Sequence, residues 1–158
     1  MRRETTVSRL VRLVLPALMR LRQFGFRSRP GWQMFRRTGT VTAEQRDTPW
    51  TWTAHSGETM QAEAGDWAVA DGGGGTWSVR DDIFRASYQH INANLWRRIG
   101  LVHARQARAG ETVETLEGRV TAANGDWVVR GERGEKWTVS DAEFTRRYEG
   151  PVERHSGD

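Results

Sequence analysis

Short stretches in which apolar and polar residues alternate follow one another from residue 33 onwards, and this period of two predicts half-buried β-strands. The clearest stretches are Thr40–Gln45, Thr59–Ala62, Leu101–Gln106 and Arg119–Ala122. Turn-forming residues between Trp67–Ala70 and Thr76–Val79 predict a β-hairpin there. Each series of strands ends where a Phe and a Tyr stand four residues apart, which predicts a short helix. The expected N-caps of these helices are Asp81 in the first series and Ser140 or Asp141 in the second.

The two series of strands are copies of one sequence. Residues 65–88 and 125–148 are identical at ten of twenty-four positions without a gap. Before them, Gln33–Gly39 recurs 61 residues later as Asn94–Gly100, and each segment contains an aromatic residue followed by two arginines. A duplication of this kind predicts that one fold is built twice.

The chain therefore divides in sequence into an arm at 1–31, a first module at 32–91, a second module at 92–152 and a tail at 153–158, which we expect to be mobile. The pattern predicts an α+β fold with two tandem small modules, mostly antiparallel β, each ending in a short helix. A module of about 60 residues is near the lower limit for an independent core. We therefore expect the modules to pack against each other about a pseudo-twofold axis.

Aromatic residues at matched positions are the expected core of both modules. They are Trp67, Trp77, Phe84 and Tyr88 in the first module and Trp127, Trp137, Phe144 and Tyr148 in the second. Eight Trp in 158 residues is a high number, and a ligand-stacking site is the alternative explanation. The matched placement favours the core, because two copies of one fold preserve the same contacts.

The arm has helical periodicity from Thr6 to Phe24, which predicts an amphipathic N-terminal helix. One face of the wheel carries Val7, Leu10, Val11, Val14, Leu18 and Leu21, and the opposite face carries Arg9, Arg12 and Arg20. Pro16 predicts a kink or two short helices. The longest uncharged run, Leu13–Met19, is too short to span a bilayer.

Charge is distributed unevenly along the chain. The net charge is +4, but residues 1–37 hold ten arginines and one acidic residue, which leaves a net charge of −5 on the remainder. Three roles for the arm stay open: packing on the body or on a second copy of the chain, binding to an anionic membrane surface, and contact with nucleic-acid phosphates. Arg outnumbers Lys 23 to one, which is typical of a high-GC bacterial genome.

The arginines are the candidate binding residues. Those of the arm are Arg9, Arg12, Arg20 and Arg22, and those of the repeated pairs are Arg36, Arg37, Arg97 and Arg98. A repeat-matched pair of guanidinium groups suits a phosphate, a nucleic acid or an acidic partner. The alternative is that each pair flanks a strand and forms ion pairs with acidic residues of the body.

Signals for catalysis, metals and cofactors are weak. Asp66 and Asp126 would share a proton or a metal if the modules faced each other, but an Asp after Gly more simply accepts backbone N–H bonds in a tight turn. Asp71–Gly75 predicts a hairpin turn and no phosphate cradle, because the matching Gly131–Glu135 contains two acidic residues. The absence of cysteine excludes thiolate chemistry, and the four histidines form no matched site. No catalytic residue, metal or cofactor is therefore expected.

The second module opens with an aromatic residue, two arginines, an apolar strand and a Gln at Trp96–Gln106. Its later motifs are Thr115–Gly118, Gly125–Val129 and Phe144–Glu149. These motifs resemble a family of short bacteriophage and bacterial proteins with a Gly-Asp-Trp/Tyr signature, the PGDYG-like domain, and the first module resembles it more weakly. Asn124 replaces the Pro that this family usually has before Gly-Asp. The resemblance supports the module boundaries and implies no activity.

Together these features predict a non-catalytic interaction or adaptor protein of the bacterial cytoplasm, of phage-derived type, with the arm as docking element. A protein partner is favoured. An anionic membrane surface or nucleic acid, reached through residues 1–37, and a homo-oligomer are the other partners considered. The alternative function is a small nucleic-acid-binding or regulatory protein that uses the Arg-rich arm.

Overall fold

The computed structural model describes residues 31–153, so the expectations for the N-terminal helix and for the tail beyond residue 153 lie outside the described residues. The described chain is mostly antiparallel β structure with two short helices, 46% strand and 11% helix, which confirms the strand-rich fold class. In this part of the chain no helix has the length and apolar character needed to cross a membrane.

Each copy of the repeat forms the same elements in the same order. The first copy contains β1 (Gln33–Arg37), β2 (Thr40–Gln45), β3 (Trp50–Thr53), β4 (Thr59–Ala62), β5 (Trp67–Ala70), β6 (Trp77–Val79), α2 (Asp81–Ser87) and β7 (Tyr88–Asn92). The second contains β8 (Leu95–Arg98), β9 (Leu101–Gln106), β10 (Thr112–Glu114), β11 (Arg119–Thr121), β12 (Trp127–Arg130), β13 (Lys136–Val139), α3 (Asp141–Arg147) and β14 (Tyr148–Glu149). The predicted hairpin is confirmed, because β5 pairs with β6 in antiparallel register.

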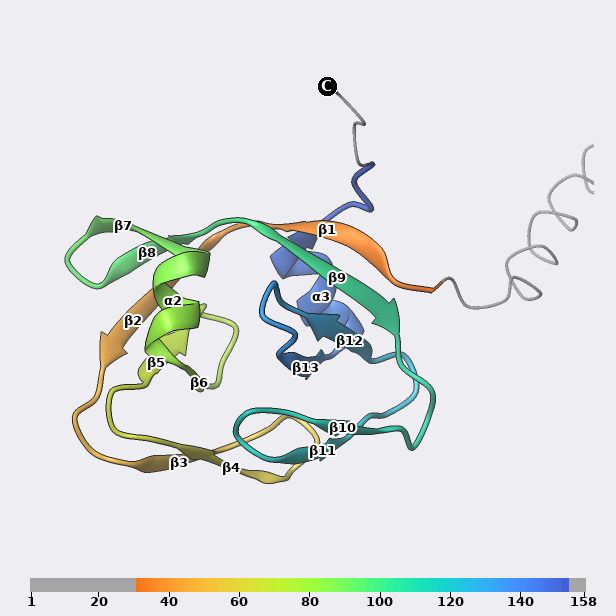
Figure 1. Ribbon diagram of the computed structural model, residues 1–158, viewed down its shortest axis with the longest axis horizontal. Helices are drawn as coiled ribbons and strands as arrows, with labels where there is room; N and C mark the ends of the chain where they lie inside the picture. The colour runs from red at the N-terminus through yellow and green to blue at the C-terminus, as the bar shows by residue number, and fades with distance from the viewer. Residues whose placement is uncertain (1–30, 154–158) are drawn as a thin grey trace, which may run out of the picture. The chain divides into compact units, whose positions relative to one another are not determined.

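The first strands of the two copies are exchanged. One five-stranded sheet has the order β6-β5-β2-β8-β7, and the other has the order β13-β12-β9-β1-β14. β8 therefore lies among strands of the first copy, and β1 among strands of the second (Figure 1). We call the first of these sheets with α2 the first half, and the second sheet with α3 the second half. The first half is continuous in sequence from β2 to β8, so the boundaries of the repeats and of the halves differ.

The chain passes between the sheets at two matched glycines. Gly39 and Gly100 have φ angles of 83° and 87°, a region that residues with a side chain rarely adopt. The backbone N–H of Arg37 donates to the carbonyl of Gly100, and that of Arg98 donates to the carbonyl of Gly39, both at 2.9 Å. These reciprocal bonds show that the crossover repeats itself about a pseudo-twofold axis.

The same aromatic ladder forms in each half. In the first half the ring of Phe84 stacks on Trp67 at 4.0 Å between centroids and on Tyr88 at 4.6 Å. In the second half the corresponding rings are Trp127, Phe144 and Tyr148, with centroid distances of 4.0 and 4.9 Å. Trp77 and Trp137 pack against these two clusters. Trp67 and Trp127 thus have equivalent surroundings.

The exchanged strands complete these ladders. Phe35 of β1 meets Phe144 of the second half edge to face, with 4.9 Å between ring centroids. Trp96 of β8 meets Phe84 of the first half in the same way at 4.7 Å. Each core therefore contains one large aromatic residue that belongs to the other copy.

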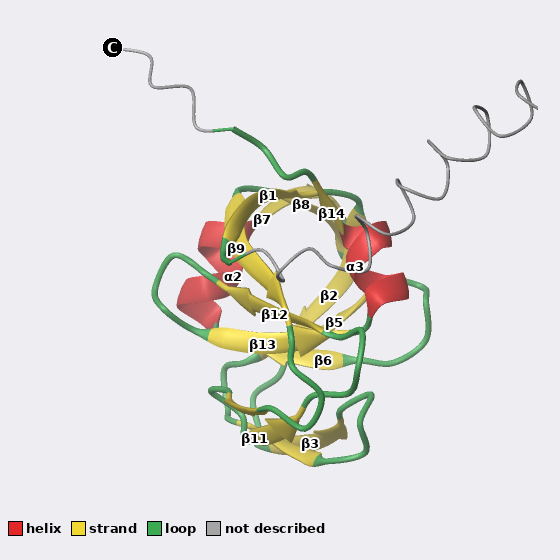
Figure 2. Cartoon of the chain, turned by 90° about the vertical axis from the view of Figure 1, so that its right-hand side faces the viewer, coloured by secondary structure: helices red, strands yellow, loops and turns green. Residues whose placement is uncertain are grey.

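The two-stranded sheets β3–β4 and β10–β11 lie together at the end of the unit away from the crossover (Figures 1 and 2). The N–H of Gln61 donates to the carbonyl of Glu117 at 2.9 Å, and Met60 shares an apolar cluster with Val120. The two copies are thus joined at both ends.

We expect Phe35 to be coupled energetically to Phe144 of the second half and not to Phe84, its partner within the same repeat. A double-mutant cycle of Phe35→Leu with Phe144→Leu should give a coupling energy of about 0.5–1.5 kcal/mol in urea unfolding. The matched cycle of Phe35→Leu with Phe84→Leu should be additive within about 0.5 kcal/mol. Coupling to Phe84 in place of Phe144 would show that β1 is not exchanged.

Candidate functional site

The strand crossover brings together the two arginine pairs that lie 61 residues apart in the sequence. Both pairs, with the links that follow them, line a shallow groove formed by residues 36–40 and 97–101. Because side chains alternate along a strand, Arg36 and Arg97 are exposed, whereas Arg37 and Arg98 are buried, with exposed fractions of 7% and 5%. Each pair therefore has one arginine that faces outward and one that faces inward.

The inward arginines lack acidic partners. Arg37 donates from Nη1 to the carbonyl of Ile99 at 3.2 Å. The guanidinium of Arg98 lies over the ring of Tyr148, 4.8 Å from its centroid, but its Nε and Nη1 atoms are buried without a hydrogen-bond acceptor. Within residues 31–153 none of the four arginines forms an ion pair. The alternative in which acidic residues of the body neutralise the pairs is therefore not observed there.

Arg98 keeps its charge inside the protein. Burial acts to lower the pKa of Arg98, but Tyr148, Tyr88 and the more distant carboxylate of Asp71 together outweigh burial, so the pKa is raised. A buried cation without a counter-ion lowers the free energy of unfolding. Residues that lower stability in this way are typical of binding sites.

A cavity of about 240 Å³ lies between the two halves. Its lining includes both inward arginines, the two matched tyrosines and the side chains of Trp52, Trp77 and Trp137. The matched tryptophans expected in the core thus also provide part of the cavity wall. The sequence does not predict this cavity, because its lining comes from both copies.

Glu117 is the most perturbed acidic group of the cavity lining. Burial raises its pKa to about 7, and the negative charge of Asp66 acts in the same direction. Hydrogen bonds from its own backbone and from Thr115 oppose these effects only in part. Near neutral pH the Glu117 carboxyl is therefore divided between its protonated and ionised forms.

Asp66 and Asp126 have structural roles in their own turns. Asp66 Oδ2 accepts the N–H of Glu63, and Asp126 Oδ2 accepts the N–H of Ala123, both at 2.9 Å. This confirms the turn interpretation. Asp126 also lies 3.0 Å from Nε2 of His55, a contact between the copies that the sequence does not indicate. Residues 31–153 contain no group of three or more His, Asp or Glu side chains placed to hold a metal.

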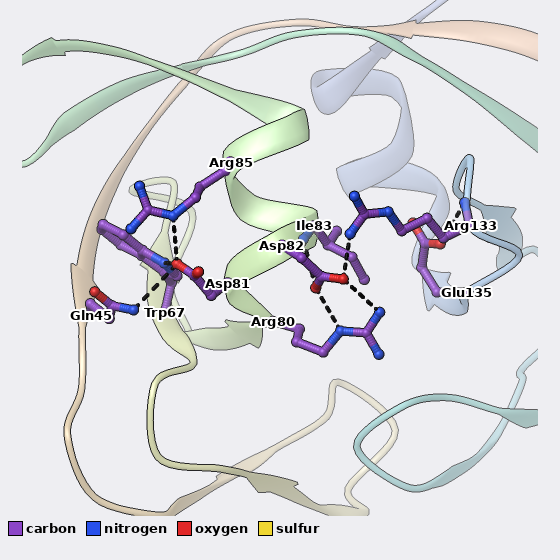
Figure 3. A network of polar contacts seen from close by, with 9 residues as sticks. All are labelled: Gln45, Trp67, Arg80, Asp81, Asp82, Ile83, Arg85, Arg133 and Glu135. Atoms are coloured by element: carbon purple, nitrogen blue, oxygen red, sulfur yellow. Dashed lines mark hydrogen bonds and ion pairs between the residues drawn. The ribbon is translucent and has the colours of Figure 1, made fainter.

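Of the predicted helix caps, Asp81 is wrong, and of the two candidates for the second helix Ser140 is confirmed and Asp141 is not. α2 has Arg80 at its N-cap with no side-chain cap bond, and α3 is capped by Ser140, which accepts the N–H of Glu143. Asp81 and Asp141 instead accept the indole N–H groups of Trp67 and Trp127, each at 2.9 Å (Figure 3 shows the first). Each Asp begins its helix beside a half-buried indole that needs an acceptor, which explains the difference.

The Asp71–Gly75 segment is a hairpin turn, as predicted, and it reaches the other half. Asp71 lies 2.5 Å from Nε of Arg147 and 3.1 Å from Nη2 of Arg146, both on α3. A second ion pair runs from the second copy to the first half: Arg133 of the matching turn pairs with Asp82 of α2 (Figure 3). The sequence does not predict these pairs, because the repeat places Ser87 where Arg147 stands.

The arginines of the arm, Arg9, Arg12, Arg20 and Arg22, lie outside the described residues. Comparisons of the chain with protein-family models, with curated proteins and with solved structures find no match. The resemblance to the PGDYG-like domain therefore still rests on the sequence motifs alone.

Replacing Arg98 with Met is expected to raise the free energy of unfolding by about 1–4 kcal/mol, because Met keeps the apolar stem and removes an unpaired buried charge. Arg97→Met, on the exposed side of the same strand, is the matched control and should change stability by less than about 0.5 kcal/mol. Urea unfolding followed by Trp fluorescence measures both. A loss of stability in Arg98→Met would show that the contact with Tyr148 outweighs the cost of burial.

Stability is expected to fall as the pH rises from about 4.5 to about 7. Over this range the folded state holds the Glu117 proton more tightly than the unfolded state, whose Glu pKa is near 4.5. Glu117→Gln removes the titratable carboxyl group, so it should flatten the pH dependence of the melting temperature. Glu114→Gln, an exposed change on β10, should leave it as in the original chain. Equal profiles for the original chain and Glu117→Gln would contradict the raised pKa.

Proposed function

We propose that the protein is a non-catalytic interaction protein whose crossover groove binds an acidic segment of a protein partner. The observation that carries this proposal is the position of Arg36 and Arg97. These residues come from different copies, are exposed in one groove, and make no ion pair with any residue of the described chain, 31–153. Of the ten groove residues four are Arg and none is acidic. Two guanidinium groups at a twofold-related position suit two carboxylates of one extended peptide.

The charge of the described unit favours a peptide over nucleic acid. Residues 31–153 carry 15 cationic and 18 acidic side chains. A net negative body opposes long-range attraction to a phosphate backbone, whereas a short acidic peptide needs only the local field of the groove. The basic arm is proposed to assist docking. The bacterial cytoplasmic location and the phage-derived, PGDYG-like origin belong to the same proposal.

A labelled poly-glutamate peptide and a poly-thymidine oligonucleotide of equal charge test the proposal by fluorescence anisotropy. The peptide should bind more tightly than the oligonucleotide. The double variant Arg36→Gln with Arg97→Gln should weaken peptide binding about five- to tenfold, because it removes two exposed ion pairs of about 0.5 kcal/mol or more each. The matched control, Arg85→Gln with Arg108→Gln, changes two exposed arginines outside the groove and should have little effect.

The same measurements on a chain lacking residues 1–31 separate the arm from the groove. Weaker peptide binding in that chain would support the arm as a docking element. Tighter binding of the oligonucleotide than of the peptide would favour the nucleic-acid alternative, and an undiminished affinity in the groove variant would remove the groove from the proposal.

A further inference from the structure

We propose that the cavity between the halves binds a small aromatic carboxylate, with its carboxylate on Arg98 and its ring between the tryptophans. The linings of this cavity and of the outer groove share Arg37 and Arg98, but the guanidinium group of Arg98 lies over Tyr148, which lines the cavity alone. The proposal rests on three observations: an unpaired buried cation, an asymmetry between the copies, and an aromatic wall.

The first observation is unpaired positive charge beneath the crossover. Arg37, Arg98 and Arg147 line the cavity and are buried or nearly so, with the Arg147 side chain 12% exposed. Arg147 is the one with acidic partners, Asp71 at 2.5 Å and Glu143 at 3.4 Å. Arg37 and Arg98 form no ion pair within residues 31–153, so the positive charge of these two residues is unpaired beside the cavity.

Within residues 31–153 the remaining charged groups of the lining form no ion pair with Arg98. Arg80 pairs with Asp82, which lies outside the lining, at 2.6 Å. Lys136, Glu135 and Glu117 also line the cavity, and protonation of Glu117 makes the cavity more positive. His55, also in the lining, already pairs with Asp126. A ligand with one negative charge would supply the acceptor that Arg98 Nε and Nη1 lack, which favours a carboxylate over a doubly charged phosphate.

The second observation is a break in the pseudo-twofold symmetry next to Arg98. The long side chain of Arg147 lies over the ring of Trp77, 4.4 Å from its centroid. Its counterpart in the first copy is Ser87, which is buried and lines the cavity. The backbone carbonyl of Ser87 accepts the N–H of Ile99 at 2.9 Å. Ile99 follows Arg98 directly. The side chain that Arg147 places over Trp77 thus has no long counterpart at Ser87, next to the strand of Arg98.

The third observation is the aromatic and apolar wall. The indole N–H of Trp52 donates to Ser78 at 2.8 Å, and that of Trp137 donates to the Tyr148 hydroxyl at 3.3 Å. With these donors satisfied, the rings offer apolar faces to a ligand, and Met60 adds a polarisable surface. The 240 Å³ volume is somewhat below the range of about 300–1,000 Å³ for drug-sized ligands, so it suits a single ring with a short acidic side chain.

Titration of the full chain with 3-phenylpropionate tests the proposal, with calorimetry and Trp fluorescence as readouts. The neutral 3-phenylpropionamide tests the charge, and acetate tests the ring. We expect the carboxylate to bind at least tenfold more tightly than either probe. Arg98→Met should lose this advantage over the amide, whereas Arg97→Met, the exposed control, should keep it.

Ser87→Leu gives an independent check that leaves the charge in place. The larger side chain fills the space beside Arg98, and it should weaken binding of the carboxylate and of the amide alike. It also covers the case in which Arg98→Met does not fold, as judged by circular dichroism. The proposal is overturned if the original chain does not bind 3-phenylpropionate, if the amide binds equally well, or if folded Arg98→Met or Ser87→Leu binds as the original chain does.

Discussion

The exchange of β1 and β8 is the constraint on which the other features of the described unit depend. A module of about 60 residues buries little apolar surface by itself, and here each core receives an aromatic ring from the other copy, Phe35 in one direction and Trp96 in the other. Loss of either strand would open one core and leave two strand edges unpaired. The halves therefore stabilise each other, and the duplication gives one compact unit from residue 31 onward.

The same exchange determines where the arginines point. Side chains two residues apart on a strand share a face. The strand that buries Phe35 therefore also buries Arg37, and the strand that turns the half-buried Trp96 inward also buries Arg98. Arg36 and Arg97 must then face outward. An outer groove and a charged interior are thus two consequences of one strand geometry, and neither requires a separate structural element.

Local pattern was sufficient to predict much of this fold, and its limits have physical causes. Alternation gave β2, β4 and β9 with their observed bounds, and turn residues gave the β5–β6 hairpin. The exchange was not predictable, because both pairings of β1 bury the same apolar residues and the short link to β2 equally suits a hairpin. The inward direction of Arg37 follows from its spacing to Phe35, a signal present in the sequence. The cavity and the Asp71–Arg147 pair depend on contacts between copies, which no local pattern encodes.

Duplication supplies a symmetric scaffold, and the chemistry then depends on where the copies differ. A symmetric lining would offer two equivalent half-sites around the axis. Arg147 and Asp71 instead close one side with an ion pair, and their counterparts, Ser87 and Gly131, have neither the length nor the charge to close the other. His55 and Glu117 likewise have no matching residue in the other copy. Since the backbone bonds at the crossover remain reciprocal, these substitutions alter the interior without disturbing the exchanged strands. A single asymmetric site within a pseudo-symmetric frame is the physical outcome.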